Sequence, residues 1–534
     1  MWPSSPGNGY LGLYIDDDIS HTRLPSTLRN SATQLCSASN DSLCGNSTVS
    51  VYAILPPCSA SVQNDCIEAV GSKTQAGAVD TGTFSRFFPE QGLADFTGDS
   101  AAKIPNGSPP SIWTLPNTPH AAGNEYMAIV SVSGTVDALR KSLGSSTIHA
   151  SLYPVKVVAG QFSRNVPSST GFGVSHPSRD TWANCASLAE GYCAARQDFP
   201  TETAFSLSLR LSTPPTGWLH GRIFSPNISL STSDGVTRLR VEATPARVPA
   251  IATWGRVDQL PSSISSPCTV DAPNCGQLNP QSAGAHTAVE NWRTVYGDKA
   301  SWVRGHWMFM TLANYFTSAC LKDTGVLYGF VTTNATGYVA GPPDYTSSNN
   351  SFSYTVASPH LDEGGAVIEG TYNFVIRSST ARCLYGIDEG AMSATVTISE
   401  AGGSTQSPAT VNVSDDGEWL KVSVSGFHYS SPVIKTTLTS TTPRTIKTEP
   451  TRMAAPSLTT AKKVTGLSIA KYAGLSVAAG SKISVTVSTT SRKVCTVVGS
   501  SVKGLRKGTC TLRVTVTPKK GKPVSKVVRL VVTK

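Results

Sequence analysis

Twelve cysteines are the feature of this sequence that most constrains its fold. Ten of them occur as near neighbours along the chain, which leaves Cys320 and Cys383 to pair with each other. An even number of cysteines in such pairs predicts a disulfide framework, and disulfides persist in proteins outside the cytosol. The expected bridges are Cys36–Cys44, Cys58–Cys66, Cys185–Cys193, Cys268–Cys275, Cys320–Cys383 and Cys495–Cys510.

A metal site is the alternative use of so many cysteines. Zinc knuckles need Cys-x-x-Cys pairs or close histidines, and the sequence has none. We therefore expect no metal and no cofactor, and an extracellular or cell-wall-associated protein. The first residues, Met1–Ser4, lack the basic start and apolar stretch of a visible export signal. The sequence contains no run of about 18 apolar residues, which a transmembrane helix would need.

Apolar residues recur at every second position in many segments, as at 205–211, 239–243, 420–424 and 483–487. This period places one face of a β-strand on a core and the other in water. Helical patterns are confined to Val136–Leu143 and Ala285–Val295. The predicted fold is all-β, with multidomain β-sandwich-like units, few short helices and a separate C-terminal domain.

Composition divides the chain further. Residues 437–462 are rich in Thr, Pro and Ser without an apolar face, which predicts an extended linker. Residues 300–436 are expected to form a β-sandwich-like domain closed by the Cys320–Cys383 bridge. Residues 1–299 are a β-rich N-terminal region, expected to hold more than one unit, and residues 463–534 form a basic domain.

Charge is strongly segregated. Residues 451–534 contain 17 Lys and Arg and no Asp or Glu, whereas residues 1–450 contain 27 basic and 34 acidic residues. A block of one sign commonly binds polyanions. Outside a cell the expected partner is an anionic cell-wall polymer or glycan rather than nucleic acid. The alternative, that the charges only keep an all-β domain soluble, stays open. Candidate wall-associating residues are Lys503, Arg506, Lys507, Lys519, Lys520 and Lys522.

Within this basic domain, the strings Val494–Gly499, Val502–Leu505, Lys507–Cys510 and Leu512–Val516 resemble a bacterial Ig-like domain. In that family a strand, a Gly turn, a Gly-Thr corner and an alternating strand follow one another. Cysteines stand here where other members have small residues, a variant found in secreted actinobacterial proteins. The resemblance implies an Ig-like fold that acts as a spacer or adhesive stalk.

A second resemblance concerns residues 318–436. The strings Gly329–Ala335, Val356–Leu361, Gly370–Tyr372 and Ala381–Tyr385 are similar to strings in large secreted actinobacterial surface proteins of unassigned function, and Trp218–Arg222 has the same character. This resemblance implies location and a β scaffold, and it implies no substrate.

No catalytic motif is present: we find no Gly-x-Ser-x-Gly, no His-Glu-x-x-His and no phosphate-binding loop. The acidic run Asp16–Asp18 near His21 could bind calcium or supply a carboxylate, but its spacing does not fit a calcium loop, and a solvated strand end is favoured. His360 precedes Asp362 and Glu363, where a polar turn is the favoured interpretation.

Two further sequence features are a candidate turn and a group of tryptophans and arginines. Asp415–Gly417 is expected to form a hairpin turn. Tryptophans and arginines gather at Trp292, Trp302, Arg304 and Trp307, and exposed tryptophans with nearby arginines could bind sugars or acidic groups. Because tryptophan is mostly buried, core packing is the favoured alternative for this stretch.

The sequence therefore favours a secreted or cell-surface structural or adhesive protein whose body binds a surface or glycan. The alternative is a secreted hydrolase of polysaccharide or peptide with a wall-targeting C-terminal domain. No catalytic residue is assigned.

Overall fold

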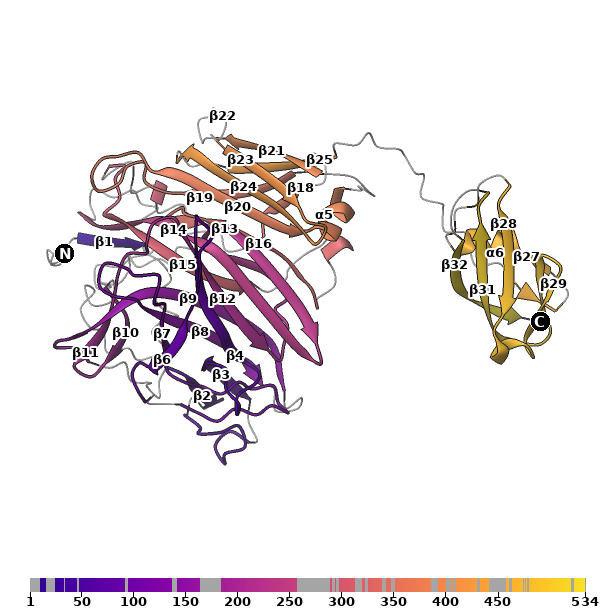
Figure 1. Cartoon of the computed structure of the whole chain (residues 1–534), viewed down its shortest axis with the longest axis horizontal. Coiled ribbons are helices and arrows are strands. Elements are labelled where there is room, and N and C mark those ends of the chain that lie inside the picture. Colours follow the sequence, from indigo (N-terminus) through magenta and orange to yellow (C-terminus); the bar gives the residue numbers. More distant parts are fainter. Residues whose placement is uncertain are drawn as a thin grey trace. The chain divides into compact units, whose positions relative to one another are not determined.

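The computed structural model describes residues 10–15, 25–32, 34–45, 48–91, 95–136, 142–163, 184–256, 289–290, 293, 297–312, 319–321, 325–338, 342–346, 351–385, 392–399, 405–406, 410–429, 433–440, 458–460, 463–473, 475, 477, 480–519 and 523–533. The chain divides into two compact units, Met1–Thr442 and Pro443–Lys534, called here the body and the tail unit (Figure 1).

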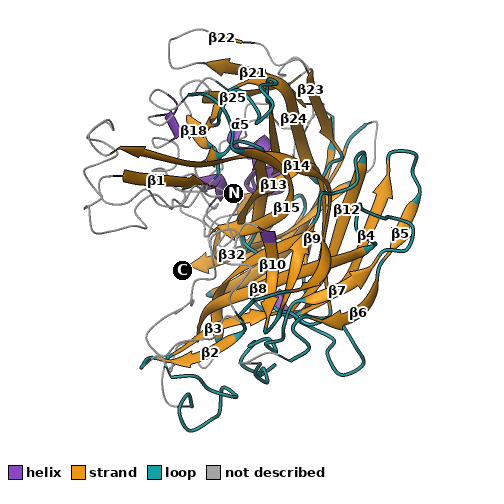
Figure 2. Cartoon of the chain, turned by 90° about the vertical axis from the view of Figure 1, so that its left-hand side faces the viewer, coloured by secondary structure: helices purple, strands orange, loops and turns teal. Residues whose placement is uncertain are grey.

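The strands of the body are β1 (Tyr10–Ile15), β2 (Thr27–Asn30), β3 (Val49–Ile54), β4 (Cys66–Thr74), β5 (Val79–Thr81), β6 (Thr83–Phe87), β7 (Ser111–Thr114), β8 (Glu125–Val136), β9 (Leu143–Ala159), β10 (Cys185–Ala189), β11 (Tyr192–Arg196), β12 (Thr203–Leu211), β13 (Gly217–Ser233), β14 (Val236–Arg256), β15 (Trp302–Leu312), β16 (Leu327–Thr333), β17 (Gly337–Tyr338), β18 (Asp344–Thr346), β19 (Ser351–Ala357), β20 (Glu369–Arg377), β21 (Met392–Ser399), β22 (Thr405–Gln406), β23 (Thr410–Asp415), β24 (Trp419–His428) and β25 (Val433–Ser440). The helical elements that the structure delimits in the body include α5 (Ser378–Tyr385) and the 3-10 turn η2 (Ala319–Leu321). The all-β fold class is confirmed, and Figure 2 shows how strongly strands dominate the described chain.

A central sheet organises the body. Its strands follow the order β7, β8, β9, β15, β13, β16, β20, β24 and β23, and β3 pairs with the part of β8 that β7 leaves open. The β13–β16 pair is parallel, and the other pairs are antiparallel. Every residue of β16 is buried. At β16, other parts of the protein therefore cover both faces of the sheet.

The first core lies between the central sheet and a second sheet formed by β5, β4, β12, β14 and the far half of β13. Alternate residues of β12, such as Phe205 and Leu207, enter this core with Trp307 and Phe309 of β15. The Phe205 ring lies 5.2 Å from the Tyr126 ring of the central sheet. The period-two pattern of 205–211 thus marks one buried face, as predicted.

The second core lies on the opposite face of the central sheet. A third sheet, in which β22, β21, β25, β19 and β18 follow one another and β17 also pairs with β19, packs there. The rings of Phe352 on β19 and Phe374 on β20 lie 4.7 Å apart. Figure 1 shows this third sheet beside β20, β23 and β24. The body consequently has three stacked sheets with these two cores between them, and β11 and β10 continue from β9 as a further sheet with smaller apolar clusters.

The boundary expected at residue 299/300 falls inside this stack. Trp218 of β13 pairs with Leu312 of β15 and with Gly329 of β16, so strands from both sides of residue 300 share one sheet. The Cys320–Cys383 bridge, which spans 63 residues, joins η2 to α5 within the same unit. Residues 300–436 therefore do not form a compact unit separate from residues 1–299.

The helix and linker expectations need correction at their ends. Val136 ends β8 and pairs with Leu143 of β9, so these two residues belong to a hairpin, and residues 137–141 lie outside the described residues. Val289, Glu290 and Arg293 are helical, in agreement with the second expected helix. β25 extends to Ser440 and β26 starts at Leu458, because Thr-rich sequence also suits strands. Of the expected linker, residues 441–457, 461 and 462 lie outside the described residues.

Five of the expected disulfides are present: Cys36–Cys44, Cys58–Cys66, Cys185–Cys193, Cys320–Cys383 and Cys495–Cys510. Cys268 and Cys275 lie outside the described residues. Such a framework is typical of proteins that fold and remain in an oxidising, extracellular environment.

The tail unit contains two sheets around a core of its own. One sheet has the order β26 (Leu458–Thr459), β32 (Val524–Thr533), β31 (Gly508–Thr517) and β28 (Lys482–Val487), and the other has β27 (Lys463–Thr465), β30 (Ser501–Gly504) and β29 (Cys495–Val498). The helix α6 (Gly466–Tyr472) and the 3-10 turn η3 (Thr489–Ser491) complete it. The buried Cys495–Cys510 bridge links the two sheets. The Ig-like identity of this unit stays a prediction.

Polar groups are also buried beside the second core. Arg222 of β13 is fully buried; one of its terminal nitrogens donates to the Thr336 carbonyl at 2.8 Å and the other to the Ala335 carbonyl. Nδ1 of the buried His220 lies 3.2 Å from the Tyr338 hydroxyl. Burial, followed by the nearby His149 and Arg222, lowers the pKa of His220 to about 3. His220 is therefore neutral in the folded protein at physiological pH.

We predict that His220 makes the body sensitive to mild acid. The unfolded chain binds a proton at this histidine below its ordinary pKa of about 6.5, whereas the folded chain does so only near pH 3. Its stabilising contribution is thus complete above about pH 6.5 and falls by up to about 1.4 kcal/mol per pH unit below it. Denaturant unfolding at pH 7 and pH 5 should show that the free energy of unfolding falls less for His220→Gln than for wild type. The exposed His428 provides the control: His428→Gln should behave as wild type, and an equal loss in all three proteins would contradict the prediction.

We also predict unequal contributions from the disulfides. In the chain-entropy view, closing the 63-residue loop of Cys320–Cys383 stabilises by about 4 kcal/mol and closing an 8-residue loop by about 2.5 kcal/mol. The double variant Cys320→Ala/Cys383→Ala should therefore unfold at lower denaturant concentration than Cys36→Ala/Cys44→Ala. Equal midpoints would show that loop length does not set the contribution.

Candidate functional site

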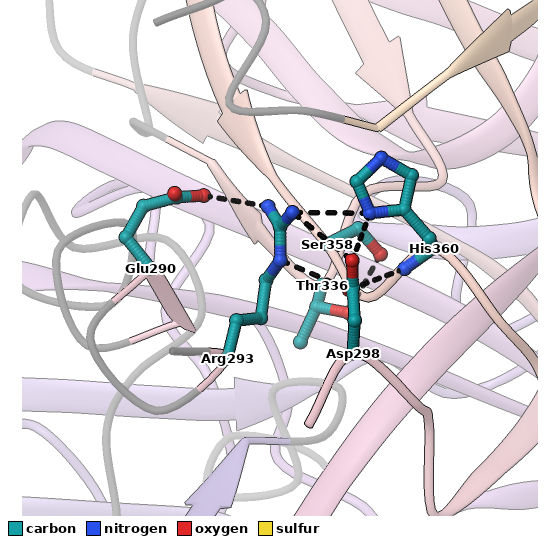
Figure 3. A network of polar contacts seen from close by, with 6 residues as sticks. All are labelled: Glu290, Arg293, Asp298, Thr336, Ser358 and His360. Carbon is teal, nitrogen blue, oxygen red and sulfur yellow. Dashed lines mark hydrogen bonds and ion pairs between the residues drawn. The ribbon is translucent and has the colours of Figure 1, made fainter. Parts of the chain in front are cut away.

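The clearest cluster of chemistry-bearing side chains in the body brings together two segments that are 62 residues apart. Asp298 lies just before β15, and Glu290 and Arg293 belong to the helical residues that precede it. His360 follows β19 in the connection to β20. We call Glu290, Arg293, Asp298 and His360 the clasp network (Figure 3).

Asp298 is the centre of the clasp network. Its Oδ1 accepts from the backbone N–H of His360 at 2.7 Å, and its Oδ2 contacts Nδ1 of the His360 ring. Arg293 forms an ion pair through Nε with Oδ1 at 2.9 Å and donates from Nη2 to Oδ2 at 3.1 Å. The same Nη2 lies 3.0 Å from the His360 Nδ1, and Nη1 donates to Glu290 at 3.1 Å.

Backbone bonds reinforce these side-chain contacts. The N–H of Ala300 donates to the Leu361 carbonyl at 2.7 Å, and the N–H of Leu361 donates to the Asp298 carbonyl at 3.1 Å. Ala300 is buried beside the second core, and the N–H of Ile368 donates to the His360 carbonyl at 2.7 Å. The network thus fastens the segment before β15 to the loop between β19 and β20.

A second pair of hydroxyls lies next to the clasp network. The buried Ser358 and Thr336 have their oxygens 3.0 Å apart, and Thr336 also donates to the Pro249 carbonyl at 2.7 Å. In Figure 3 the ring nitrogen of His360 that does not contact Asp298 points away from the Ser358 and Thr336 hydroxyls. The Ser358 hydroxyl therefore takes part in packing rather than in a contact with that nitrogen.

Chemically, an aspartate that contacts Nδ1 orients an imidazole so that Nε2 can exchange protons with a substrate. A hydrolase also needs a nucleophile or a second carboxylate at the reacting bond. The contacts of Ser358 with Thr336 do not supply one. The clasp network consequently contains an oriented histidine without a second reacting group. Its contacts are those of a structural network that joins two segments of the chain.

Sequence analysis located His360 but named the wrong acids beside it. Asp362 accepts the N–H groups of Gly364 and Ala366 at 2.9 and 2.8 Å and so closes a polar turn, which was the favoured interpretation. Asp298, the true neighbour, was missed because nothing in the sequence relates it to a histidine 62 residues away. Asp415–Gly417 is a hairpin turn between β23 and β24, as predicted, with Gly417 at φ +89°.

Trp302 and Trp307 do not form a shared platform, and the burial of Trp307 agrees with core packing, the favoured interpretation. Trp307 is 1% exposed in the first core, and its indole N–H donates to the Ala243 carbonyl at 2.9 Å. Trp302 is half-buried, with the Arg304 guanidinium 5.4 Å from its ring centre. Trp302 and Trp307 are five residues apart on β15, so they face opposite sides of the strand. Trp292 lies outside the described residues.

The basic residues of the tail unit lie at its surface. From Lys463 onward the structure describes twelve basic side chains; eleven are exposed and Lys503 is half-buried. Arg506 and Lys507 lie at the turn between β30 and β31, and Lys519 follows β31. Lys520 and Lys522 lie outside the described residues, as do Asp16–Asp18 and His21 of the body.

Among the described residues, no three His, Cys, Asp or Glu side chains gather in a group that could hold a metal ion. The helices that the structure describes include none that is long and apolar enough to cross a membrane. No protein-family model, curated protein or solved structure matches the chain.

We predict that the clasp network holds residues 289–300 in place. Asp298→Asn keeps the shape of the side chain but removes the charge that Arg293 and His360 face, so opening of this segment should become easier by about 1–3 kcal/mol. Hydrogen exchange of the peptide that covers 289–300 should accelerate accordingly. Asp362→Asn is the matched control, because its carboxylate serves only the turn; equal exchange in Asp298→Asn and wild type would rule out the clasp.

Proposed function

We propose that the chain is a secreted or cell-surface structural or adhesive protein. In this proposal the body binds a surface or glycan, and the tail unit associates with an anionic cell-wall polymer. The resemblance to secreted actinobacterial surface proteins, with a bacterial Ig-like domain at the C-terminal end, belongs to the same proposal.

The observation that carries the proposal is the exposure of unbalanced charge on a separate compact unit. Residues 451–534 have 17 basic and no acidic residues, and eleven of the twelve basic side chains described there are exposed. No Asp or Glu within residues 451–534 is present to neutralise these cations. Such a surface attracts polyanions over distances of about the Debye length.

The five disulfides support an extracellular setting for this association. In that setting the abundant polyanions are wall polymers and lipid headgroups rather than nucleic acids. The stacked sheets of the body, fastened by bridges and the clasp network, fit a rigid scaffold.

A secreted hydrolase with a wall-targeting tail is the alternative function, and the Asp298–His360 contact is the observation that favours it. A hydrolase would need its substrate to contact Nε2 of His360, and it would need a second reacting group from the surrounding surface. We rank it second because the contacts of the clasp network are already explained by its structural role.

We predict that retention of the full chain on purified cell walls depends on salt. The chain should bind at about 0.05 M salt and be released well below 1 M, because the Debye length shrinks from roughly 14 Å to about 3 Å over that range. Walls stripped of their anionic polymers provide the control and should retain little protein. Retention that persists in molar salt, or on stripped walls, would contradict the electrostatic mechanism. Release of soluble wall fragments in the same assay, lost in His360→Gln, would make the hydrolase the leading function.

A further inference from the structure

The four-stranded sheet of the tail unit has an inner and an outer face of very different character. Along β31 the buried residues are Cys510, Leu512, Val514 and Val516, which face the core of the unit. The residues between them therefore point the other way. On β32 the same alternation buries Val528, Leu530 and Val532. We call the side of β28, β31 and β32 that faces away from the core the outer face.

The strand register fixes which side chains are neighbours on the outer face. Arg513 lies opposite Val527, and Thr511 lies opposite Arg529. Arg513 and Arg529 are thus diagonal neighbours on adjacent strands, a relation that spans about 7–8 Å. On the other side of β31, Thr486 of β28 lies opposite Arg513. The two arginines consequently lie close together on the two central strands of the four-stranded sheet.

The surroundings of this arginine pair suit a polar polymer better than an apolar partner. Arg513 and Arg529 are both exposed, as are Val527 and Val531, which are 61% and 65% exposed. Most other outward positions on β31 are threonines, such as Thr511 and Thr515. The face therefore offers hydroxyl donors and scattered methyl groups rather than the continuous apolar centre of a stable protein interface.

Charge complementarity decides the occupant. Residues 451–534, which include every strand of the outer face, contain no Asp or Glu, so no acidic side chain on these strands competes for the two arginines. A guanidinium presents a planar fork of donors that matches the oxygens of a phosphate in two parallel hydrogen bonds. Two forks on diagonally neighbouring residues can hold successive or shared phosphates of one polymer, with the valine methyl groups available to its carbon backbone.

We propose that the outer face of the tail unit, centred on Arg513 and Arg529, binds a polymer of repeating phosphodiester groups. This inference rests on the proposed function, which it deepens by naming the face and the anion. It also assigns the binding contacts to the sheet rather than to the turn at Arg506 and Lys507.

The test measures binding of the full chain to poly(glycerol phosphate) of defined length at 0.15 M salt, with uncharged dextran as the reference polymer. Arg513→Gln/Arg529→Gln should weaken binding about tenfold or more, since each lost charge-assisted contact is strong. Arg492→Gln/Lys493→Gln removes the same charge from the exposed turn after η3, outside the strands of the outer face, and should weaken binding no more than about threefold. Arg513→Lys/Arg529→Lys keeps the charge but not the fork, and should fall between wild type and the glutamine variant.

The outcomes separate this inference from the proposed function. Equal weakening by the two glutamine double variants would overturn the outer face as the site, while wild-type binding would keep the proposed function. Failure of the wild type to bind the polymer even at about 0.05 M salt would overturn both. Tighter binding to vesicles of anionic phospholipid than to the polymer would identify a membrane surface as the partner, against the inference.

Discussion

The part of the central sheet that lies between the two cores must bury both of its faces, and much of the body follows from that requirement. Every residue of β16 is buried, and β13 sends Leu219 into the first core and Trp218 into the second. Side chains of one strand must also be able to lie close to the backbone of the next. A side chain at Gly329 would overlap the Trp218 indole, which stacks on Phe374 at 6.0 Å. Glycine at this position lets the two cores share a single sheet.

Such a doubly buried sheet must also satisfy the polar groups trapped at its ends. Asn334, just after β16, accepts from the Thr371 N–H at 2.7 Å and from the Tyr429 hydroxyl, and donates to the carbonyls of Arg247 and Glu369 at 3.2 and 3.0 Å. Its side-chain amide is therefore fully bonded. Arg222 donates to the neighbouring Thr336 carbonyl at 2.8 Å. The hydroxyls of Thr336 and Ser358 continue this buried polar layer toward the clasp network.

The sequence predicted what depends on local pattern. Alternation located strands such as β12, β24 and β28, the neighbour rule paired the cysteines, and Asp415–Gly417 marked a hairpin. Local sequence patterns could not predict the contacts between distant segments. β16 is buried on both faces and so shows no alternation, which hid the continuity of the sheet across residue 300. Asp298 meets His360 only through the pairing of remote strands, and Trp302 and Trp307 were grouped by proximity although an odd spacing separates them on a strand.

In the proposed function the body is a rigid scaffold and the tail unit adheres to polyanions. Hydrogen exchange of the full chain, with and without poly(glycerol phosphate) at 0.15 M salt, tests this division of roles. A ligand that binds only the folded tail unit stabilises that unit by mass action. We expect slower exchange in peptides of β28, β31 and β32 and unchanged exchange throughout the body. Slower exchange in the body with an unchanged tail unit would contradict it.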